Sequence, residues 1–185
     1  MTKAQLTVLA GPTAVGKGTV VAALTKRFPT LNVSISATTR DPRPGELNGV
    51  HYYFVSAQEF DAMIERGDML EWALVHGKNK YGTPRGPVDE ALAAGKPVLL
   101  EIDLAGARQV RTNRPDAQFI FLAPPSWEEL ESRLIGRGTE GPEEQARRLA
   151  TARVELEAAS EFDHVVINDD VERAVDELAR LIGLE

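Results

Sequence analysis

The sequence predicts an α/β fold of three layers, in which helices cover both faces of a central parallel sheet. Apolar runs of strand length alternate along the chain with segments in which apolar residues recur at helical spacing. A glycine-rich segment, residues 11–19, lies where the first strand gives way to the first helix. Strands that alternate with helices pair in parallel through right-handed crossovers. We therefore expect a ligand site where the C-terminal ends of the strands meet.

The first half of the chain predicts a strand, a helix and a small mixed lobe. Residues 6–10 are apolar and partly β-branched, which is typical of a strand buried on both faces, and residues 20–28 follow with helical spacing. Residues 32–86 are rich in threonine, glycine and tyrosine and contain short β-like runs. Within them, residues 56–59 have the spacing of a capping box before a helix that Gly67 closes.

The second half continues the alternation, with glycine and proline between the elements. The apolar run at 97–103 ends in two carboxylates, Glu101 and Asp103. The expected elements are helix 86–95, strand 97–103, strand 117–122, helices 127–135 and 142–160, strand 164–167 and helix 170–182. They predict a single domain with a core at 1–33, 86–125 and 160–185, a small lobe at 34–85 and a helical lid at 126–159.

Composition excludes several classes of protein. The 185 residues are enough for one domain with a full core, and the absence of cysteine excludes disulfides and thiolate chemistry. The three histidines have no metal-ligand spacing. A net charge of −7 argues against nucleic-acid binding, which needs a basic surface. No signal peptide or membrane span is predicted, so we expect a cytoplasmic protein, monomeric by default, with a homo-oligomer left open.

The glycine-rich segment has the pattern of a loop that binds the phosphates of a nucleoside triphosphate. Its glycines let backbone N–H groups at the start of a helix surround phosphate oxygens, and Lys17 adds a positive charge. Gly18 stands where the strict pattern has a hydroxyl, which comes one residue later at Thr19. We therefore expect Thr19 to reach Mg²⁺ through water. The predicted ATP-binding residues are Gly11, Pro12, Thr13, Ala14, Val15, Gly16, Lys17, Gly18 and Thr19.

Arginines gather in two segments that the predicted topology brings toward the same edge of the sheet. Arg40 and Arg43 form the first group, and the second follows the strand at 117–122. Guanidinium groups beside a phosphate loop favour the binding of anionic ligands. The second group consists of Arg133, Arg137, Arg147, Arg148 and Arg153.

Several short motifs, in one order along nearly the whole chain, resemble those of guanylate kinases. They are the phosphate loop, Ser-Ala-Thr-Thr-Arg at 36–40, Pro-Arg at 42–43, the run at 45–54, Glu-Trp-Ala at 71–73, Tyr-Gly-Thr at 81–83, Ile-Asp at 102–103, Ala-Pro-Pro-Ser at 123–126, Arg-Gly-Thr-Glu at 137–140, Arg-Arg-Leu at 147–149 and Asn-Asp-Asp at 168–170. The resemblance implies transfer of a phosphoryl group from ATP to GMP, and also to dGMP, in purine nucleotide metabolism. It makes the lobe at 34–85 the GMP-binding part.

The resemblance also implies how GMP is recognised. Paired guanidinium groups and hydroxyl donors suit a monophosphate dianion, and guanine offers donors at N1 and N2 that suit carboxylates and an acceptor at O6 that suits a hydroxyl. The implied phosphate ligands are Arg40, Arg43, Tyr52 and Tyr81, and the implied base ligands are Ser36, Glu71, Thr83 and Asp103. Other interpretations remain open from the residues alone, namely a surface salt bridge for Glu71 and a helix N-cap for Asp103.

Phosphoryl transfer needs cations around the transferring group more than it needs a nucleophile. The expected catalytic residues are Lys17, Arg137 and Arg148, of which the two arginines lie on the lid by resemblance. The implied cofactor is Mg²⁺ bound with ATP, with Glu101 or Asp103 as an acidic group nearby. Asn168 resembles a position near the adenine, although it could also cap the helix that follows.

Two other functions are compatible with parts of the pattern. A non-catalytic module with the guanylate-kinase fold could bind a phosphorylated peptide, and such a module would not need the phosphate loop. A kinase of the same architecture could act on AMP, a pyrimidine monophosphate or a phosphorylated sugar. Lys17, Arg137 and Arg148 favour an enzyme, and the set of Glu71, Asp103, Ser36 and Thr83 favours guanine.

Overall fold

A computed structural model describes residues 3–136 and 138–185. Its main sheet has five strands in the order β2-β7-β1-β8-β9, and every pairing between them is parallel. The C-terminal ends of these strands therefore meet at one edge, as the sequence predicts. The strands are β1 (Leu6–Ala10), β2 (Asn32–Val33), β7 (Val98–Glu101), β8 (Gln118–Ala123) and β9 (His164–Ile167).

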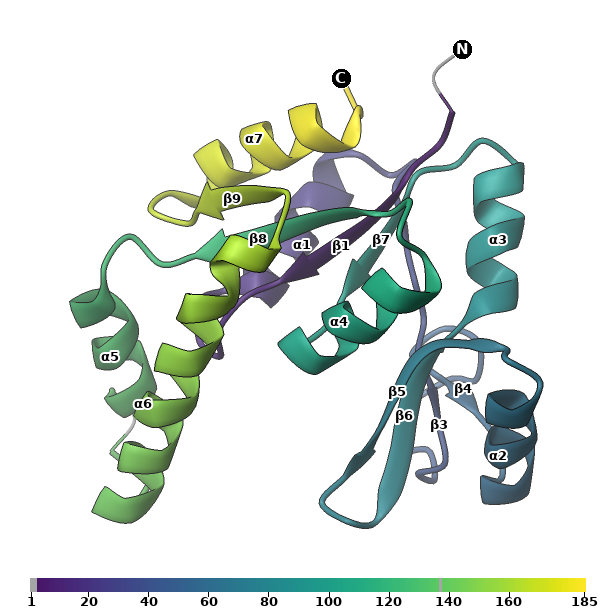
Figure 1. Cartoon of the computed structure of the whole chain (residues 1–185), viewed down its shortest axis with the longest axis horizontal. Coiled ribbons are helices and arrows are strands. Elements are labelled where there is room, and N and C mark those ends of the chain that lie inside the picture. The colour runs from purple at the N-terminus through teal and green to yellow at the C-terminus, as the bar shows by residue number, and fades with distance from the viewer. Residues whose placement is uncertain (1–2, 137) are drawn as a thin grey trace.

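Helices cover both faces of this sheet, which confirms the predicted three layers (Figure 1). The helices α1 (Lys17–Arg27) and α7 (Val171–Ile182) bury one face, where Leu9 and Ile120 belong to a large apolar cluster. The helices α3 (Arg85–Ala93) and α4 (Leu104–Asn113) bury the other face, against Val8 and Phe119. Because neighbours along β1 alternate between faces, the strand can be apolar throughout.

A second, four-stranded sheet lies below one end of the main sheet in Figure 1. Its order is β4-β3-β6-β5, and β5 and β6 form an antiparallel hairpin. The helix α2 (Ala57–Glu65) packs on it through Phe60 and Met63. Ser56 caps this helix by accepting a hydrogen bond from the Glu59 N–H at 3.0 Å, as predicted. The strands are β3 (Ala37–Thr38), β4 (Tyr53–Phe54), β5 (Met69–Val75) and β6 (Asn79–Pro84).

Two helices project from the other end of the main sheet, on the same side as the second sheet (Figure 1). They are α5 (Trp127–Ile135) and α6 (Pro142–Glu157), followed by the short 3₁₀ helix η1 (Ala158–Glu161). Their contact is a small apolar cluster of its own, built on Leu130, Leu134 and Ala152. A pair of helices with a separate small core can move relative to the sheet more readily than a helix packed on the main core.

The structure corrects two predicted boundaries. The strand expected at 97–103 ends at Glu101, and Asp103 instead caps α4 by accepting a hydrogen bond from the Gly106 N–H at 2.8 Å. The helix α4 itself was not predicted, because an interior glycine, Gly106, and several polar residues weaken the helical spacing of its apolar residues. The helix expected at 142–160 ends at Glu157, where η1 begins.

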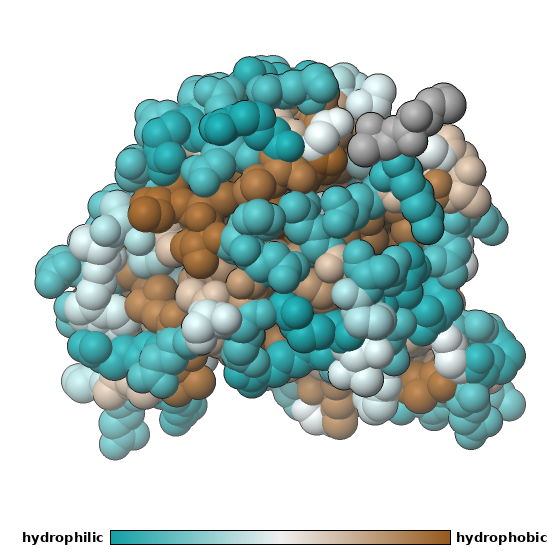
Figure 2. Space-filling model, turned by 45° about the horizontal axis from the view of Figure 1, so that its top comes forward, coloured by the Kyte–Doolittle hydropathy of each residue, from teal (hydrophilic) through white to brown (hydrophobic). Residues whose placement is uncertain are grey.

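Figure 2 shows a largely hydrophilic face with an apolar band beneath α7, in the region of the β9 edge of the main sheet. Val165 and Ile167 on β9 are 46% and 45% exposed. Each helix in the described ranges, 3–136 and 138–185, is too short or too polar to cross a membrane.

Candidate active site

The loop at residues 11–19 curls at the C-terminal end of β1 and leads into α1. Its backbone enters the left-handed region twice, at Ala14 and Gly16, with φ values of 69° and 95°. Such alternation turns successive N–H groups to one concave side, which forms an anion-binding nest. A Cβ atom at Gly16 would lie 2.9 Å from Nδ2 of Asn168, so only glycine fits there. Among the described residues no side chain caps α1 at Gly16, which leaves its first N–H groups available to phosphate.

Lys17 reaches across the end of the sheet. Its Nζ donates hydrogen bonds to the carbonyl oxygens of Gly11 at 3.3 Å and Ile102 at 3.1 Å, so it spans the ends of β1 and β7. Burial lowers the pKa of Lys17, and three nearby carboxylates oppose that shift. These carboxylates belong to Glu101, Glu155 and Asp103. The ammonium group therefore lies between the phosphate loop and Ile102, the residue before Asp103.

Two side chains from distant elements support the loop through one carbonyl group. The oxygen of Val15 accepts a hydrogen bond from Nδ2 of buried Asn168 at 2.8 Å and another from Nη1 of Arg133 at 3.3 Å. Asn168 does not cap α7, because the Asp170 side chain does so. Its direct partner here is the loop backbone, and its contact with adenine stays a prediction.

A pair of carboxylates meets beside the start of α4. Glu71 on β5 is only 9% exposed and accepts a hydrogen bond from the Thr83 hydroxyl at 2.8 Å. A Cβ atom at Gly106 would lie 3.1 Å from Oε2 of Glu71 and equally far from Oδ1 of Asp103, so both carboxylates face the same point. Burial raises the pKa of Glu71, the Thr83 hydrogen bond opposes this shift and the charge of Asp103 adds to it.

The structure thus brings Glu71, Thr83 and Asp103 together, and the surface salt bridge considered for Glu71 is wrong. The helix N-cap considered for Asp103 is confirmed, and this residue can combine capping with ligand binding because a carboxylate has two oxygens.

A second cluster forms around Arg40, at the end of β3. Its guanidinium carbon lies 5.3 Å from the ring centroid of Tyr52, whose ring is 6.1 Å from that of Tyr81. Glu46 accepts two parallel hydrogen bonds from Arg40, at 3.1 and 2.9 Å, and this pairing raises the pKa of Arg40 above its usual range. The cluster contains three of the predicted phosphate ligands, and Glu46 fixes the orientation of the arginine.

Three other predicted residues have clear positions. Ser36 lies directly before β3, where its carbonyl accepts a hydrogen bond from the Tyr53 N–H at 2.9 Å. Arg43 is exposed in the loop after β3, and Thr19 is exposed on the first turn of α1.

The helical pair carries the remaining predicted cations. Arg148 on α6 pairs with Glu140 at 2.5 Å and lies 3.8 Å from Glu144. A hollow of about 250 Å³ separates this part of α6 from the phosphate loop, and its lining includes Thr13, Arg148 and Thr151. Arg137, the other predicted arginine of the lid, lies outside the described residues.

Sequence reasoning missed Glu155, which lies one helical turn beyond Thr151 on the same face of α6. Its half-buried carboxylate lies near the backbone N–H of Thr13 and near Lys17. Burial raises the pKa of Glu155, while the charge of Lys17 opposes the shift. The signal that could have identified Glu155 is its position two helical turns after Arg148, on the same face of α6.

The start of α1 has oxygen ligands that suit a hard divalent cation. Oε1 of Glu101 lies 3.9 Å from the point that a Cβ atom of Gly18 would occupy, and the exposed Thr19 hydroxyl is on the next residue. Within the described ranges no group of three or more histidine, aspartate or glutamate side chains could hold a metal alone. The residues therefore fit Mg²⁺ that takes its other ligands from phosphate and water.

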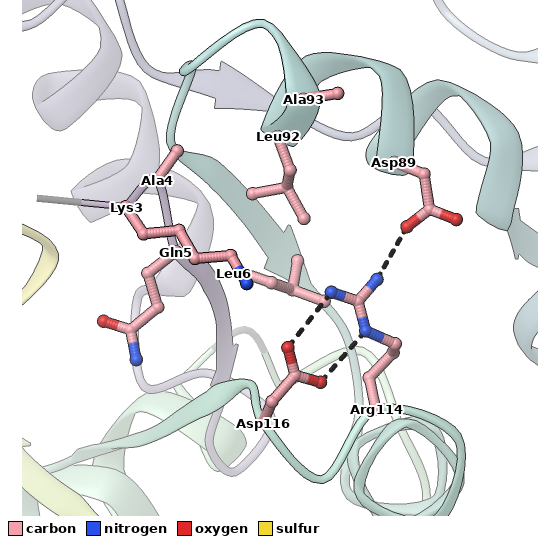
Figure 3. A pocket seen from close by; sticks show the side chains of 9 residues that line it. All are labelled: Lys3, Ala4, Gln5, Leu6, Asp89, Leu92, Ala93, Arg114 and Asp116. Atoms are coloured by element: carbon pink, nitrogen blue, oxygen red, sulfur yellow. Dashed lines mark hydrogen bonds and ion pairs between the residues drawn. The ribbon is translucent and has the colours of Figure 1, made fainter.

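A larger hollow of about 470 Å³ lies at the opposite edge of the sheet, by the start of β1 (Figure 3). Its only guanidinium group belongs to Arg114, which Asp89 and Asp116 hold at 2.7 and 3.1 Å. Because two carboxylates occupy this fork and the hollow is at the N-terminal ends of the strands, it does not compete with the loop as a phosphate site.

Comparisons with known proteins match this chain to guanylate kinases. A family model described as guanylate kinase matches residues 3–185. The guanylate kinase of Thermobifida fusca is 60% identical over 97% of this chain and 91% of that protein, and that of Nocardia farcinica is 59% identical over 97% and 93%. The crystal structure of guanylate kinase from Anaplasma phagocytophilum has a TM-score of 0.73 and 30% identity, covering 99% of this chain and 86% of the other.

Proposed function

This chain belongs to the guanylate kinase family, and we propose that it transfers the γ-phosphoryl group of ATP to GMP, and likewise to dGMP. The observation that carries this proposal is the position of paired carboxylates beside a triphosphate loop. Lys17 donates to the carbonyl of Ile102, and the next residue is Asp103, which faces Glu71. Base recognition and phosphate binding are therefore only one residue apart at the end of β7.

The carboxylate pair suits guanine. Guanine presents N–H groups at N1 and N2, and Glu71 and Asp103 converge as acceptors, while the Thr83 hydroxyl lies 2.8 Å from Glu71. Adenine has no donor at its N1 and would leave the buried Glu71 carboxylate unpaired, which a desolvated site penalises strongly. Ser36 supplies a further hydroxyl at the start of β3.

The Arg40 cluster suits the monophosphate. Glu46 uses part of the Arg40 guanidinium group, which has five N–H donors in all, and the remaining donors with the hydroxyls of Tyr52 and Tyr81 can bind a phosphate dianion. Arg43 adds a mobile cation from the neighbouring loop. The same groups serve GMP and dGMP, because base and phosphate are identical in both.

For the transfer step we propose direct, in-line attack by a GMP phosphate oxygen on the γ-phosphorus of ATP, with ADP as the leaving group and no covalent enzyme intermediate. The loop N–H groups and Lys17 hold the donor phosphates. Arg148, together with Arg137, closes from the lid over the transferring group and excludes water. Thr19 and Glu101 would hold Mg²⁺ through water, and the ion would neutralise charge on the donor phosphates. Asn168 holds the loop and borders the adenine.

These substrates imply a role in cytoplasmic purine nucleotide metabolism, with the monomer as the working unit and no nucleic-acid partner. The net charge of −7 supports small anionic ligands in a local basic pocket over a polyanion.

The test is ADP formation from Mg-ATP by the purified protein, with GMP, dGMP, UMP, CMP or no acceptor. We expect turnover with the two guanine nucleotides only, and its loss in Lys17→Ala. Arg85→Ala, an arginine on α3 outside the site, is the matched control and should retain turnover. Turnover with a pyrimidine acceptor would overturn the guanine assignment. Nucleotide binding without turnover on any acceptor would favour the phosphopeptide-binding module.

A further inference from the structure

The edge of the second sheet is completed by side chains from α4. The strand β5 pairs with β6 on one side only, and α4 lies along its other side, between the two sheets in Figure 1. Gln109 makes two hydrogen bonds with the backbone of Trp72: its Oε1 accepts from the N–H at 3.1 Å, and its Nε2 donates to the carbonyl at 2.9 Å. Nδ2 of Asn113 donates to the carbonyl of Leu70 at 2.8 Å.

These contacts hold the backbone on both sides of Glu71. The pairing of β5 with β6 is irregular between Met69 and Glu71, so Leu70 lies at a bulge. A bulge changes the direction of the side chain that follows it and leaves the strand without regular pairing at that point. Asn113 fixes the bulge itself, and Gln109 fixes the residue after Glu71.

The same face of α4 also receives the Glu71 side chain. Asp103, Gly106, Gln109 and Asn113 follow one another at intervals of three or four residues, which places them on one face of the helix. Oε2 of Glu71 lies 3.1 Å from where a Cβ atom of Gly106 would be, so any larger residue would push the carboxylate away. One helix face therefore sets the backbone and the side chain of Glu71 together.

We propose that Gln109 is a positioning residue for guanine specificity, with Asn113 as its second support. This inference rests on the proposed function. Gln109 bonds both the N–H and the carbonyl group of Trp72 and so fixes the backbone next to Glu71. Glu71 then stays beside Asp103, and both carboxylates face the N1 and N2 donors of guanine. A displacement of about 1 Å at such a site can cost on the order of 100-fold in rate. Both hydrogen bonds of Gln109 go to Trp72 on β5, whereas Arg40 follows β3 and Tyr81 lies on β6.

Comparison of GMP with IMP separates positioning from general support. IMP has the same phosphate and N1 donor as GMP but lacks the 2-amino group. A correctly placed carboxylate pair prefers GMP, whereas a displaced Glu71 reads the two bases alike. Loss of a residue that only supports the fold would lower kcat/KM for both nucleotides by the same factor. The ratio of kcat/KM for GMP to kcat/KM for IMP, called the GMP to IMP ratio, would then stay constant.

The experiment measures kcat and KM with GMP and IMP, Kd for both by calorimetry, and KM for ATP. Gln109→Met keeps the size of the side chain and removes both hydrogen bonds. Gln109→Asn keeps the amide group but shortens the side chain by one methylene group. We expect a KM for GMP raised about tenfold and a ratio of kcat/KM for GMP to that for IMP reduced about tenfold, which corresponds to about 1.4 kcal/mol. KM for ATP should stay within about twofold. Asn113→Ala should act in the same direction with a smaller effect.

The matched control is Gln118→Met on β8. Gln118 accepts a hydrogen bond from the Thr7 hydroxyl at 3.2 Å, at the opposite edge of the main sheet, so this change should leave the GMP to IMP ratio unaltered. An unchanged ratio in folded Gln109 variants would overturn the inference. If Gln109→Met does not fold, Gln109→Asn and Asn113→Ala decide. Failure of the proposed function differs, because the wild-type protein would then turn over neither nucleotide, and the ratio of Kd values would still test Gln109.

Discussion

At the scale of single residues, the site contains carboxylates that the fold buries at a cost. Desolvation raises the pKa of Glu71, and the nearby charge of Asp103 adds to this effect. A polar neutral partner, the Thr83 hydroxyl, offsets only part of it. Within the described residues these contacts give Glu71 no cationic partner. A ligand that brings N–H donors therefore stabilises the ionised form.

This raised pKa predicts a pH dependence of GMP recognition. In the proposed function the ionised Glu71 accepts hydrogen bonds from guanine, so KM for GMP should increase as the pH falls through the raised pKa of Glu71. Glu71→Gln should abolish this pH dependence of KM for GMP and lower kcat/KM for GMP by about 100-fold, with KM for ATP unchanged.

The same raised pKa predicts an effect on stability. In the absence of ligand, burial favours the protonated form of Glu71, so the free energy of unfolding decreases as the pH rises through that pKa. Glu71→Gln should therefore not lower the unfolding temperature at neutral pH.

The measurements are pH profiles of kcat/KM for wild type and Glu71→Gln. A wild-type profile in GMP that is flat down to the pH where the fold is lost would contradict the role of Glu71. Glu65→Gln, on the exposed end of α2, serves as the control for loss of one acidic charge.

Glu155 predicts an effect on the other substrate. Its carboxylate lies near the Thr13 N–H and near Lys17, where the terminal phosphate of ATP is expected. Replacing it by glutamine removes a like charge from that position. We expect Glu155→Gln to lower KM for ATP by about fivefold, which corresponds to roughly 1 kcal/mol for a partly screened charge.

KM for GMP should not change in Glu155→Gln. Glu157→Gln, two residues further along α6 and exposed, is the matched control. A raised KM for ATP in Glu155→Gln would instead mean that the carboxylate helps to hold the nucleotide.

At the scale of secondary-structure elements, α4 connects the two sheets. Its N-cap Asp103 accepts from the Gly106 N–H, and its later turns hold β5 through Gln109 and Asn113. The helix that holds the strand of Glu71 therefore also contributes the second carboxylate of the proposed guanine site. Capping and recognition can be separated by substitution, since asparagine caps helices about as well as aspartate but has no charge.

Asp103→Asn should melt within about 1 °C of wild type and still lose about 100-fold in kcat/KM for GMP. Asp103→Ala should lose the same activity and, in addition, about 1 kcal/mol of stability, or about 2–4 °C. Asp170, the N-cap of α7, offers the matched comparison: Asp170→Ala should lose stability alone. Thermal melts and GMP kinetics on these variants make the test. If Asp103→Asn remained fully active, the carboxylate would be only a cap.

Local signals determined how much of this architecture could be predicted. The continuous apolar runs of the buried strands and the helix N-cap at Ser56 depend on neighbouring residues, and both are confirmed. The helix α4 was missed because an interior glycine and many polar residues weaken its pattern, and its function comes from Gln109 and Asn113 binding a strand far away in the sequence. Glu155 was missed for the same reason, since its partner Thr13 is near the other end of the chain.

At the scale of the whole molecule, one edge of the parallel sheet gathers contributions from three parts. The main sheet supplies the loop and Lys17, the second sheet supplies Glu71 and the Arg40 cluster, and the helical pair faces the loop across a hollow of about 250 Å³. The proposed acceptor and donor sites would meet where Lys17 donates to the carbonyl of Ile102. Specificity and transfer are therefore expected to depend on the same small region.

The central claim is that this region recognises guanine, and the most direct measurement is the ratio of kcat/KM for GMP to that for AMP in one ADP-release assay with saturating Mg-ATP. The account predicts a ratio on the order of 10⁴ or more, because AMP leaves the buried carboxylate of Glu71 and the facing carboxylate of Asp103 without the N1 and N2 donors of guanine. A ratio near one, or a preference for AMP, would contradict it.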